Sequence, residues 1–136
     1  MKLYDHGPQP MVINIDAATA QNENYRTALW TGDFLQVTLM TLPVGGEIGL
    51  EVHPDTDQFL RVESGTGLVQ MGDTRDTLTD RQMADQHTAI VVPAGTCHNL
   101  KNTGSSELKL YSIYAPPHHP HGTVQATKAI ADAEET

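Results

Sequence analysis

The fold of this chain is decided by the stretch Val91-Val92-Pro93-Ala94-Gly95-Thr96-Cys97-His98-Asn99-Leu100-Lys101-Asn102. Two β-branched residues lead into Pro93-x-Gly95, a combination that favours a tight turn between strands. In the strand that follows, alternation of side chains places His98 and Leu100 on the same face. We therefore expect His98 to point inward beside an apolar neighbour.

A second stretch lies upstream and carries a carboxylate and an imidazole two residues apart. It reads GGEIGLEVHPDTDQFLRVESG from Gly45 to Gly65. We expect a strand over 48–53, in which alternation places Glu51 and His53 side by side on one face. The alternative is an ordinary polar pair that faces solvent.

The strand that returns after the turn at Pro54-Asp55 has its apolar side chains at Leu60 and Val62. Extending that phase backward places Gln58 on the same inner face, where a hairpin would oppose it to the upstream carboxylate and imidazole. If the sheet closes so that the strand of His98 faces this hairpin, the four polar side chains meet in one cluster. Gln58 would then either contribute its amide oxygen directly to the chemistry of the cluster or orient the carboxylate through a hydrogen bond.

The rest of the chain is predicted to be mostly short strands, with turns every eight to twelve residues or so. This spacing favours an all-β, antiparallel jelly-roll barrel. A short helix is expected within 16–25, a terminal helix or frayed tail over 124–136, and an irregular polar segment over about 72–86. The other expected strands lie at 27–30, 34–42, 58–63, 67–71, 88–92, 97–102 and 108–114.

The composition bounds the partners of the protein. Eight Lys and Arg residues against 17 Asp and Glu residues give a formal charge of −9, which repels phosphate backbones and anionic membrane surfaces. No apolar run approaches the roughly 18 residues of a membrane-spanning helix. The single cysteine, Cys97, excludes an internal disulfide. We therefore expect a soluble, cytoplasmic, single-domain protein without nucleic-acid or membrane partners.

The later stretch resembles the second motif of the cupin superfamily, P-x-G-x-x-H-x-x-x-N. The matching residues are Pro93, Gly95, His98 and Asn102, while His87 stands where the motif usually opens with glycine. This motif is specific, and it identifies the chain as a small single-domain cupin.

The earlier stretch resembles the first cupin motif, G-x5-H-x-H-x3,4-E-x6-G, with substitutions. Aligned backward from Gly65, Gln58 stands at the position of the usual Glu ligand, His53 at the second His and Glu51 at the first. The resemblance covers roughly 29–117 and extends to short cupins often described as candidate sugar-phosphate isomerases. We divide the chain into an N-terminal arm (1–27), a cupin β-barrel (28–117) and a Pro/His-rich segment with a C-terminal helix or tail (118–136).

The resemblance implies a homodimer that binds a small molecule and one divalent metal ion per chain. The implied ligands are Glu51, His53, Gln58 and His98. Like the usual set of three His and one Glu, this set contributes one negative charge, so the carboxylate has moved and has not been lost. Mixed nitrogen and oxygen ligation suits Mn, Fe(II), Ni or Zn.

Several polar residues outside the two motifs are candidates for a role at the barrel mouth. The run APPHHPHG at 115–122 contains three histidines, and if it folds over the mouth, His119 or His121 would serve as acid or base. Tyr114 is a further candidate, and Arg26 is free to reach an anionic substrate. The alternatives for this run are a second metal site or, in preference to that, exposed or interface histidines.

Three functions remain open at this point. The first is a metal-dependent enzyme with an open two-His, one-carboxylate site, in which isomerase, epimerase and dioxygenase chemistry are not distinguished. The second is a non-catalytic cupin that binds or senses a small ligand or a metal. The third is a metal-free sugar epimerase that uses His98 and Tyr114 as an acid–base pair.

Overall fold

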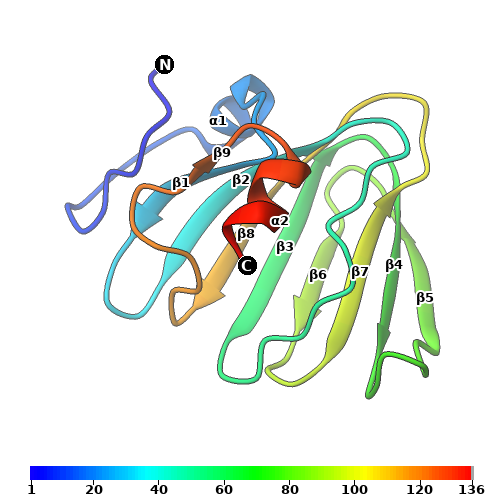
Figure 1. Ribbon diagram of the computed structural model, residues 1–136. Helices are drawn as coiled ribbons and strands as arrows, with labels where there is room; N and C mark the ends of the chain where they lie inside the picture. The colour runs from blue at the N-terminus through cyan, green and yellow to red at the C-terminus, as the bar shows by residue number, and fades with distance from the viewer. Residues whose placement is uncertain (136) are drawn as a thin grey trace.

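Two antiparallel sheets make up most of the computed structural model, which describes residues 1–135 (Figure 1). The larger sheet has the strand order β6-β3-β8-β2-β1-β9, and the smaller has the order β5-β4-β7. The expected fold, an all-β jelly roll with short helices near the termini, is confirmed. The elements are α1 (Ile15–Gln21), β1 (Arg26–Thr31), β2 (Gln36–Leu42), β3 (Asp57–Ser64), β4 (Gly67–Gly72), β5 (Asp80–Ala84), β6 (Ala89–Val92), β7 (Cys97–Asn102), β8 (Leu108–Ala115), β9 (Val124–Gln125) and α2 (Lys128–Glu134).

Two polar segments contain strands that the sequence did not predict, whereas the helix expected near the N-terminus is formed. Segment 72–86 was expected to be irregular, yet it contains β5, a mostly exposed edge strand that pairs with β4. The segment 124–136 forms β9 and then α2, and its last residue, Thr136, lies outside the described residues. The helix expected within 16–25 is α1, which begins after the N-cap Asn14.

The strand predicted over 48–53 is not formed as a continuous strand. One isolated bridge, between Glu51 and His98, joins this segment to β7, and a second joins the preceding Glu47 to Lys101. Gly49 has a φ of +101°, a left-handed conformation that interrupts the alternation of a strand. The backbone therefore follows β7 irregularly, and strand alternation alone does not explain why Glu51 and His53 approach each other.

The inner face of the larger sheet is apolar at one end and polar at the other. Directly paired residues on neighbouring strands share a face. The apolar end contains the paired, fully buried residues Met40, Leu110 and Val62. The polar end contains the paired, buried residues Gln36, Tyr114 and Gln58. Burial of each large apolar side chain contributes roughly 1.5–3 kcal/mol, so the apolar end stabilises the sheet while the polar end offers hydrogen-bonding groups to the interior.

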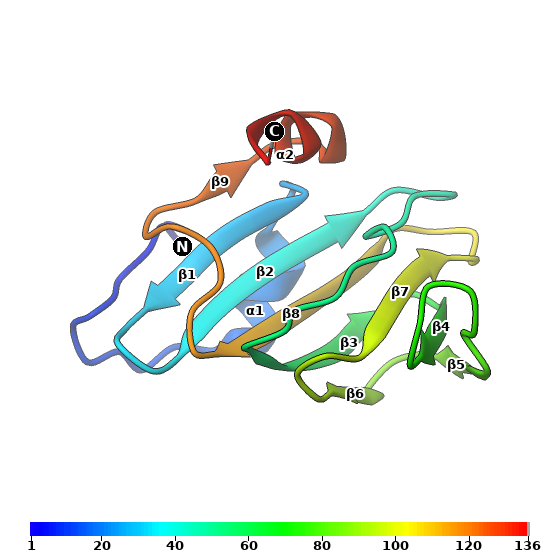
Figure 2. The same ribbon diagram turned by 60° about the horizontal axis from the view of Figure 1, so that its bottom comes forward.

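The two helices cover opposite faces of the larger sheet (Figure 2). Ala18 of α1 packs with Leu29 and Leu39 on the outer face, whereas Ala131 of α2 belongs to the inner core cluster. Within residues 1–135 no helix is long and apolar enough to cross a membrane. Phe34, between β1 and β2, is 83% exposed. The homodimer that the resemblance implies stays a prediction.

A pair of carboxyl groups joins α1 to β3. The side chain of Glu63 is 8% exposed and lies beside the carboxyl group of Asp16 in α1. Burial, and then the adjacent Asp16 carboxyl, raise the pKa of Glu63 to about 7, although Arg61 acts in the opposite direction. Because this value lies above the ordinary 4.5, the folded protein holds an extra proton, and the associated stability is lost as the pH rises from about 4.5 to about 7.

We expect the variant Glu63→Gln to gain thermal stability relative to the wild-type protein as the pH rises through this window. The amide removes the ionised form that is unfavourable beside Asp16, so the difference in melting temperature should grow by several degrees between pH 4.5 and pH 8. Thermal unfolding followed by circular dichroism at both pH values measures this difference. A difference that stays constant across the window would contradict the assignment.

Candidate metal centre

Three side chains with metal-binding groups meet in the interior. The carboxylate Oε1 of Glu51 lies 3.4 Å from Nε2 of His53 and 3.6 Å from Nε2 of His98. One ligand atom from each residue lies within 4.8 Å of the other two. We call these residues the Glu/His/His cluster, and their convergence agrees with the sequence-based prediction.

Backbone hydrogen bonds hold the members of the cluster together. The backbone amides of Glu51 and His98 each donate to the other residue's carbonyl, with N–O distances of 3.0 and 2.9 Å. The carbonyl of His53 accepts a hydrogen bond from the amide of Gly95 at 2.8 Å. Gly95 has a φ of +86° and belongs to the turn that precedes β7. The turn of the second motif therefore holds a residue of the first motif in place.

The protonation of His98 is fixed by its contact with the backbone. Nδ1 lies 3.1 Å from the carbonyl oxygen of Thr96, and because a carbonyl only accepts, Nδ1 carries the proton and donates it. Nε2 is therefore the ring nitrogen of His98 that faces Glu51, and a bound metal ion would take the place of any proton on it. Nε2 of both histidines and Oε1 of Glu51 are buried without a hydrogen-bond partner in the protein. Since such unpaired atoms are costly, three of them converging on one point suit a shared cation.

The carboxyl group of Glu51 is held in its ionised form. Burial raises the pKa of this group, but the neighbouring His53 and His98 side chains outweigh burial and hold the pKa well below its usual range. The carboxylate therefore carries a negative charge at neutral pH. This is the form in which a carboxylate binds a metal ion.

Gln58 presents a free oxygen on the inner face of β3. Its Nε2 donates to Oγ of Ser112 at 2.8 Å, which fixes the amide orientation, while its Oε1 is buried and unpaired. The hairpin predicted to oppose Gln58 to Glu51 is not formed, because β3 pairs with β6 and β8 instead. Direct ligation by Gln58 stays a prediction.

A second group of side chains lies next to the cluster. The ring centroid of His118 is 4.1 Å from that of His53, and Nε2 of His119 is 3.3 Å from the hydroxyl of Tyr114. Burial, followed by the charge of Arg26, lowers the pKa of His119 to about 3, and burial raises the pKa of Tyr114. Both groups are therefore neutral at pH 7, and the contact between them joins two neutral groups.

His121 lies elsewhere. Its Nε2 is 2.8 Å from the carbonyl oxygen of Gly7 and 3.4 Å from Oδ1 of Asp5, and its side chain is 56% exposed. Of the predicted acid–base candidates, the structure thus brings Tyr114 and His119 together and places His121 against the N-terminal arm. His98 is not in hydrogen-bonding contact with Tyr114, whose partner is His119.

Gln36 is a site residue that the sequence gave no reason to single out. It is fully buried, and its Oε1 accepts hydrogen bonds from the backbone amides of His118 and His119 at 3.1 and 2.9 Å. Its Nε2 donates to the carbonyl of His119 at 2.8 Å and to Oγ1 of Thr31 at 3.0 Å. One glutamine amide therefore holds the two histidines in place beside the cluster.

We expect Gln36→Leu to release the backbone at His118 and His119. Loss of the acceptor should speed hydrogen exchange of these two amides about tenfold or more, because a hydrogen bond of this kind stabilises by about 1 kcal/mol and two are lost. Exchange measured by NMR, relative to the amides of Val69 and Leu100 in the smaller sheet, separates local release from general destabilisation. Equal acceleration of hydrogen exchange at all four amides would argue against a role of Gln36 in holding the backbone at His118 and His119.

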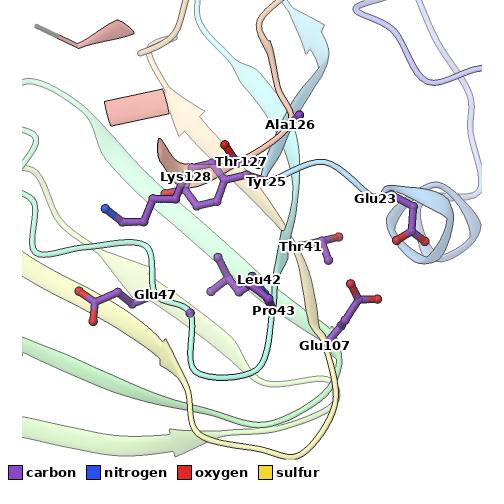
Figure 3. A pocket seen from close by; sticks show the side chains of 11 residues that line it. Glu23, Tyr25, Thr41, Leu42, Pro43, Glu47, Glu107, Ala126, Thr127 and Lys128 are labelled. Atoms are coloured by element: carbon purple, nitrogen blue, oxygen red, sulfur yellow. The ribbon is translucent and has the colours of Figure 1, made fainter. Parts of the chain in front are cut away.

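A separate cavity of about 250 Å³ lies between the C-terminal segment and the loop after β2 (Figure 3). Tyr25 and Leu42 are part of its wall, and no residue of the Glu/His/His cluster lines it. Its charged lining residues largely have partners. Glu23 pairs with Lys109, Lys128 pairs with Asp132, and Glu47 contacts Asn99. The groups suited to chemistry therefore lie at the cluster and not in this cavity.

A jelly roll with metal-binding side chains contributed by two motifs defines a cupin. The family model described as the cupin domain matches residues 38–114, and the chain belongs to this family. It is 59% identical over 133 residues to the uncharacterised protein YrkC of Bacillus subtilis (strain 168), covering 98% of this chain and 72% of YrkC.

Two further similarities extend along most of the chain. The crystal structure of BH2720 from Bacillus halodurans superposes with a TM-score of 0.96 at 61% identity, covering 96% of this chain and 99% of that one. An uncharacterised protein of Acanthamoeba polyphaga mimivirus is 36% identical over 121 residues, covering 88% of this chain and 74% of the viral protein. A small single-domain cupin is therefore supported along nearly the whole chain.

Proposed function

We propose that the protein binds one divalent metal ion at the Glu/His/His cluster and acts as a metal-dependent enzyme on a small molecule. The observation that carries this proposal is the convergence of three buried, unpaired ligand atoms within 4.8 Å of one another. The orientation of His98 adds support, because its Nδ1 is engaged by the Thr96 carbonyl and its Nε2 faces the cluster. The residues present fit a metal ion, since two imidazoles and one carboxylate suit Mn, Fe(II), Ni or Zn.

The contribution of each residue follows from its contacts. Glu51 supplies the single negative charge of the cluster, and His53 and His98 supply neutral nitrogen atoms. Gln58 offers a fourth, neutral oxygen. A divalent ion held by these residues would supply a Lewis acid beside a small substrate.

Proton transfer is assigned to the neighbouring pair. The Tyr114 hydroxyl and Nε2 of His119 lie 3.3 Å apart next to the cluster, so these two side chains are the candidate acid–base pair. Such a pair suits isomerisation or epimerisation, in which a proton moves between two substrate atoms. We therefore favour this chemistry over dioxygenase chemistry.

Two alternatives remain distinct proposals. A binding or sensing cupin would use the same cluster without turnover. A metal-free sugar epimerase would depend on an acid–base pair alone, and the contact between Tyr114 and His119 supplies a better pair than His98 with Tyr114. A metal-free epimerase differs from the proposed enzyme in its metal content. A binding or sensing cupin differs from it because no product is formed.

The proposal is tested by elemental analysis of protein purified without a histidine tag. We expect about one divalent ion per chain, and a lower melting temperature after removal of the ion by a chelator, because a ligand that binds only the folded state stabilises it. Restoring the ion should restore both the melting temperature and turnover. A protein that stays free of Mn, Fe, Ni and Zn after incubation with each of these ions would contradict the proposal.

A further inference from the structure

Arg26 carries a buried positive charge without a carboxylate partner. It is 2% exposed, and among residues 1–135 no Asp or Glu forms an ion pair with it. Its Nη1 donates to Oε1 of Gln125 at 2.6 Å, and Gln125 in turn donates to Glu134. The Nε of Arg26 is buried and has no partner. The guanidinium of Arg26 is thus connected to the carboxylate of Glu134 only through the neutral amide of Gln125. No carboxylate pairs directly with this buried positive charge.

The guanidinium faces the same interior as the Glu/His/His cluster. Arg26 pairs with Met40 across β1 and β2, and Met40 belongs to the inner core. The guanidinium lies beside the hydroxyl of Tyr114. The ring of Tyr114 is 5.9 Å from that of His53, centroid to centroid. A single side chain, Tyr114, therefore contacts both the cation and the cluster.

Buried polar atoms without a protein partner gather in this interior. Such atoms are uncommon in folded proteins. In the described part of the chain, six of the eight belong to the cluster or to the inner face of the larger sheet. These six are Arg26 Nε, Thr38 Oγ1, Glu51 Oε1, His53 Nε2, Gln58 Oε1 and His98 Nε2. Their concentration points to a polar ligand whose atoms satisfy them.

The charges in the interior determine whether an anionic or a cationic ligand is favoured there. Arg26 supplies a positive charge that no carboxylate pairs directly, at a distance from the Glu51 carboxylate of the cluster, and a divalent ion at the cluster would add one further net positive charge. The net charge of −9 on the whole chain acts over longer distances and is screened beyond about 8–10 Å. A guanidinium donates parallel hydrogen bonds to carboxylates and phosphates. An anionic ligand is therefore favoured locally.

We propose that Arg26 binds the oxyanion group of a small substrate, a carboxylate or a phosphate ester, while the reacting end of that substrate lies at the Glu/His/His cluster. Tyr114 and His119 lie next to both ends, so the bound substrate comes within reach of the proton-transfer pair. The position of the reacting end rests on the proposed function. The binding of the anion by Arg26 does not require the metal.

The test is isothermal titration calorimetry on chelator-treated protein with three probes: acetate, inorganic phosphate and acetamide. We expect acetate or phosphate to bind and acetamide, the neutral match of acetate, to fail, and the preferred anion identifies the oxyanion. Arg26→Met should lower the affinity for that anion at least about tenfold. The matched control Arg75→Met removes an exposed arginine of segment 72–86 and should leave the affinity unchanged.

Equal anion affinity in Arg26→Met and Arg75→Met, or equal binding of acetate and acetamide, would overturn the inference. If Arg26→Met does not fold, a crystal of the wild-type protein grown with selenate decides. An anomalous peak within hydrogen-bonding distance of the guanidinium supports the proposal, and a peak elsewhere or none overturns it. Anion binding in a protein that takes up no metal would refute the proposed function alone, and metal uptake without anion binding would refute this inference alone.

Discussion

Glu51→Gln is expected to lower the affinity of the protein for its divalent ion by at least about 100-fold, since changes in the residues that merely support metal ligands already cost 10–100-fold. The amide keeps the size of the side chain but removes the single negative charge of the Glu/His/His cluster. His53 and His98 would remain as two neutral ligands. Competition with a chelator of known affinity, followed by elemental analysis, measures the loss.

The matched control for this variant is Glu47→Gln, the same chemical change four residues earlier. Oε1 of Glu47 contacts Nδ2 of Asn99 at 3.4 Å, outside the cluster, so metal affinity should remain at the wild-type level. The melting temperatures of the two metal-free variants should be similar. Full metal occupancy in Glu51→Gln would show that the ion is held by other residues.

Gly65→Ala is expected to destabilise the protein by about 2–4 kcal/mol and to lower its melting temperature by roughly 10 °C. Gly65 has a φ of +90°, and a Cβ atom there would lie 2.6 Å from the carbonyl oxygen of Glu107 and 2.9 Å from Cα of Leu108. Both are backbone atoms, one just before β8 and one at its first residue, and two neighbouring strands hold β8 in place. They cannot move aside without disturbing the sheet.

Gly95→Ala serves as the control for Gly65→Ala because it separates backbone strain from collision. Gly95 has a similar φ of +86°, but a Cβ atom there would meet nothing within 4 Å. We expect a cost of only about 1 kcal/mol, the strain of a left-handed backbone. Chemical denaturation of the two variants measures both costs. Equal costs would show that collision with β8 contributes nothing.

The two sequence motifs predicted the cluster correctly, although part of the reasoning was wrong. The inward direction of His98 follows from the turn at Pro93-x-Gly95 and from strand alternation, and β7 confirms it. Glu51 and His53 were grouped by strand alternation, but no continuous strand is present there. The contacts of their backbones with β7 and with Gly95 hold them instead.

Two motif positions have structural roles that the sequence alone did not distinguish from chemical ones. His87, which replaces the usual glycine, has a φ of +73°, so the left-handed backbone persists without glycine. Asn102 is buried, and its Nδ2 lies 3.0, 3.1 and 2.9 Å from the carbonyl oxygens of Leu42, Pro43 and Ser106. It connects two loops and does not face the cluster.

The sequence by itself determined the all-β class and the inward direction of His98 and Gln58, because turn residues and apolar alternation are local properties of the backbone. Only the tertiary structure decided what else surrounds the cluster. Gln36 meets His118 across 82 positions of sequence, and Arg26 meets Gln125 across 99. Local periodicity does not encode such contacts, since they depend on how strands distant in the chain pair and on where their long polar side chains end.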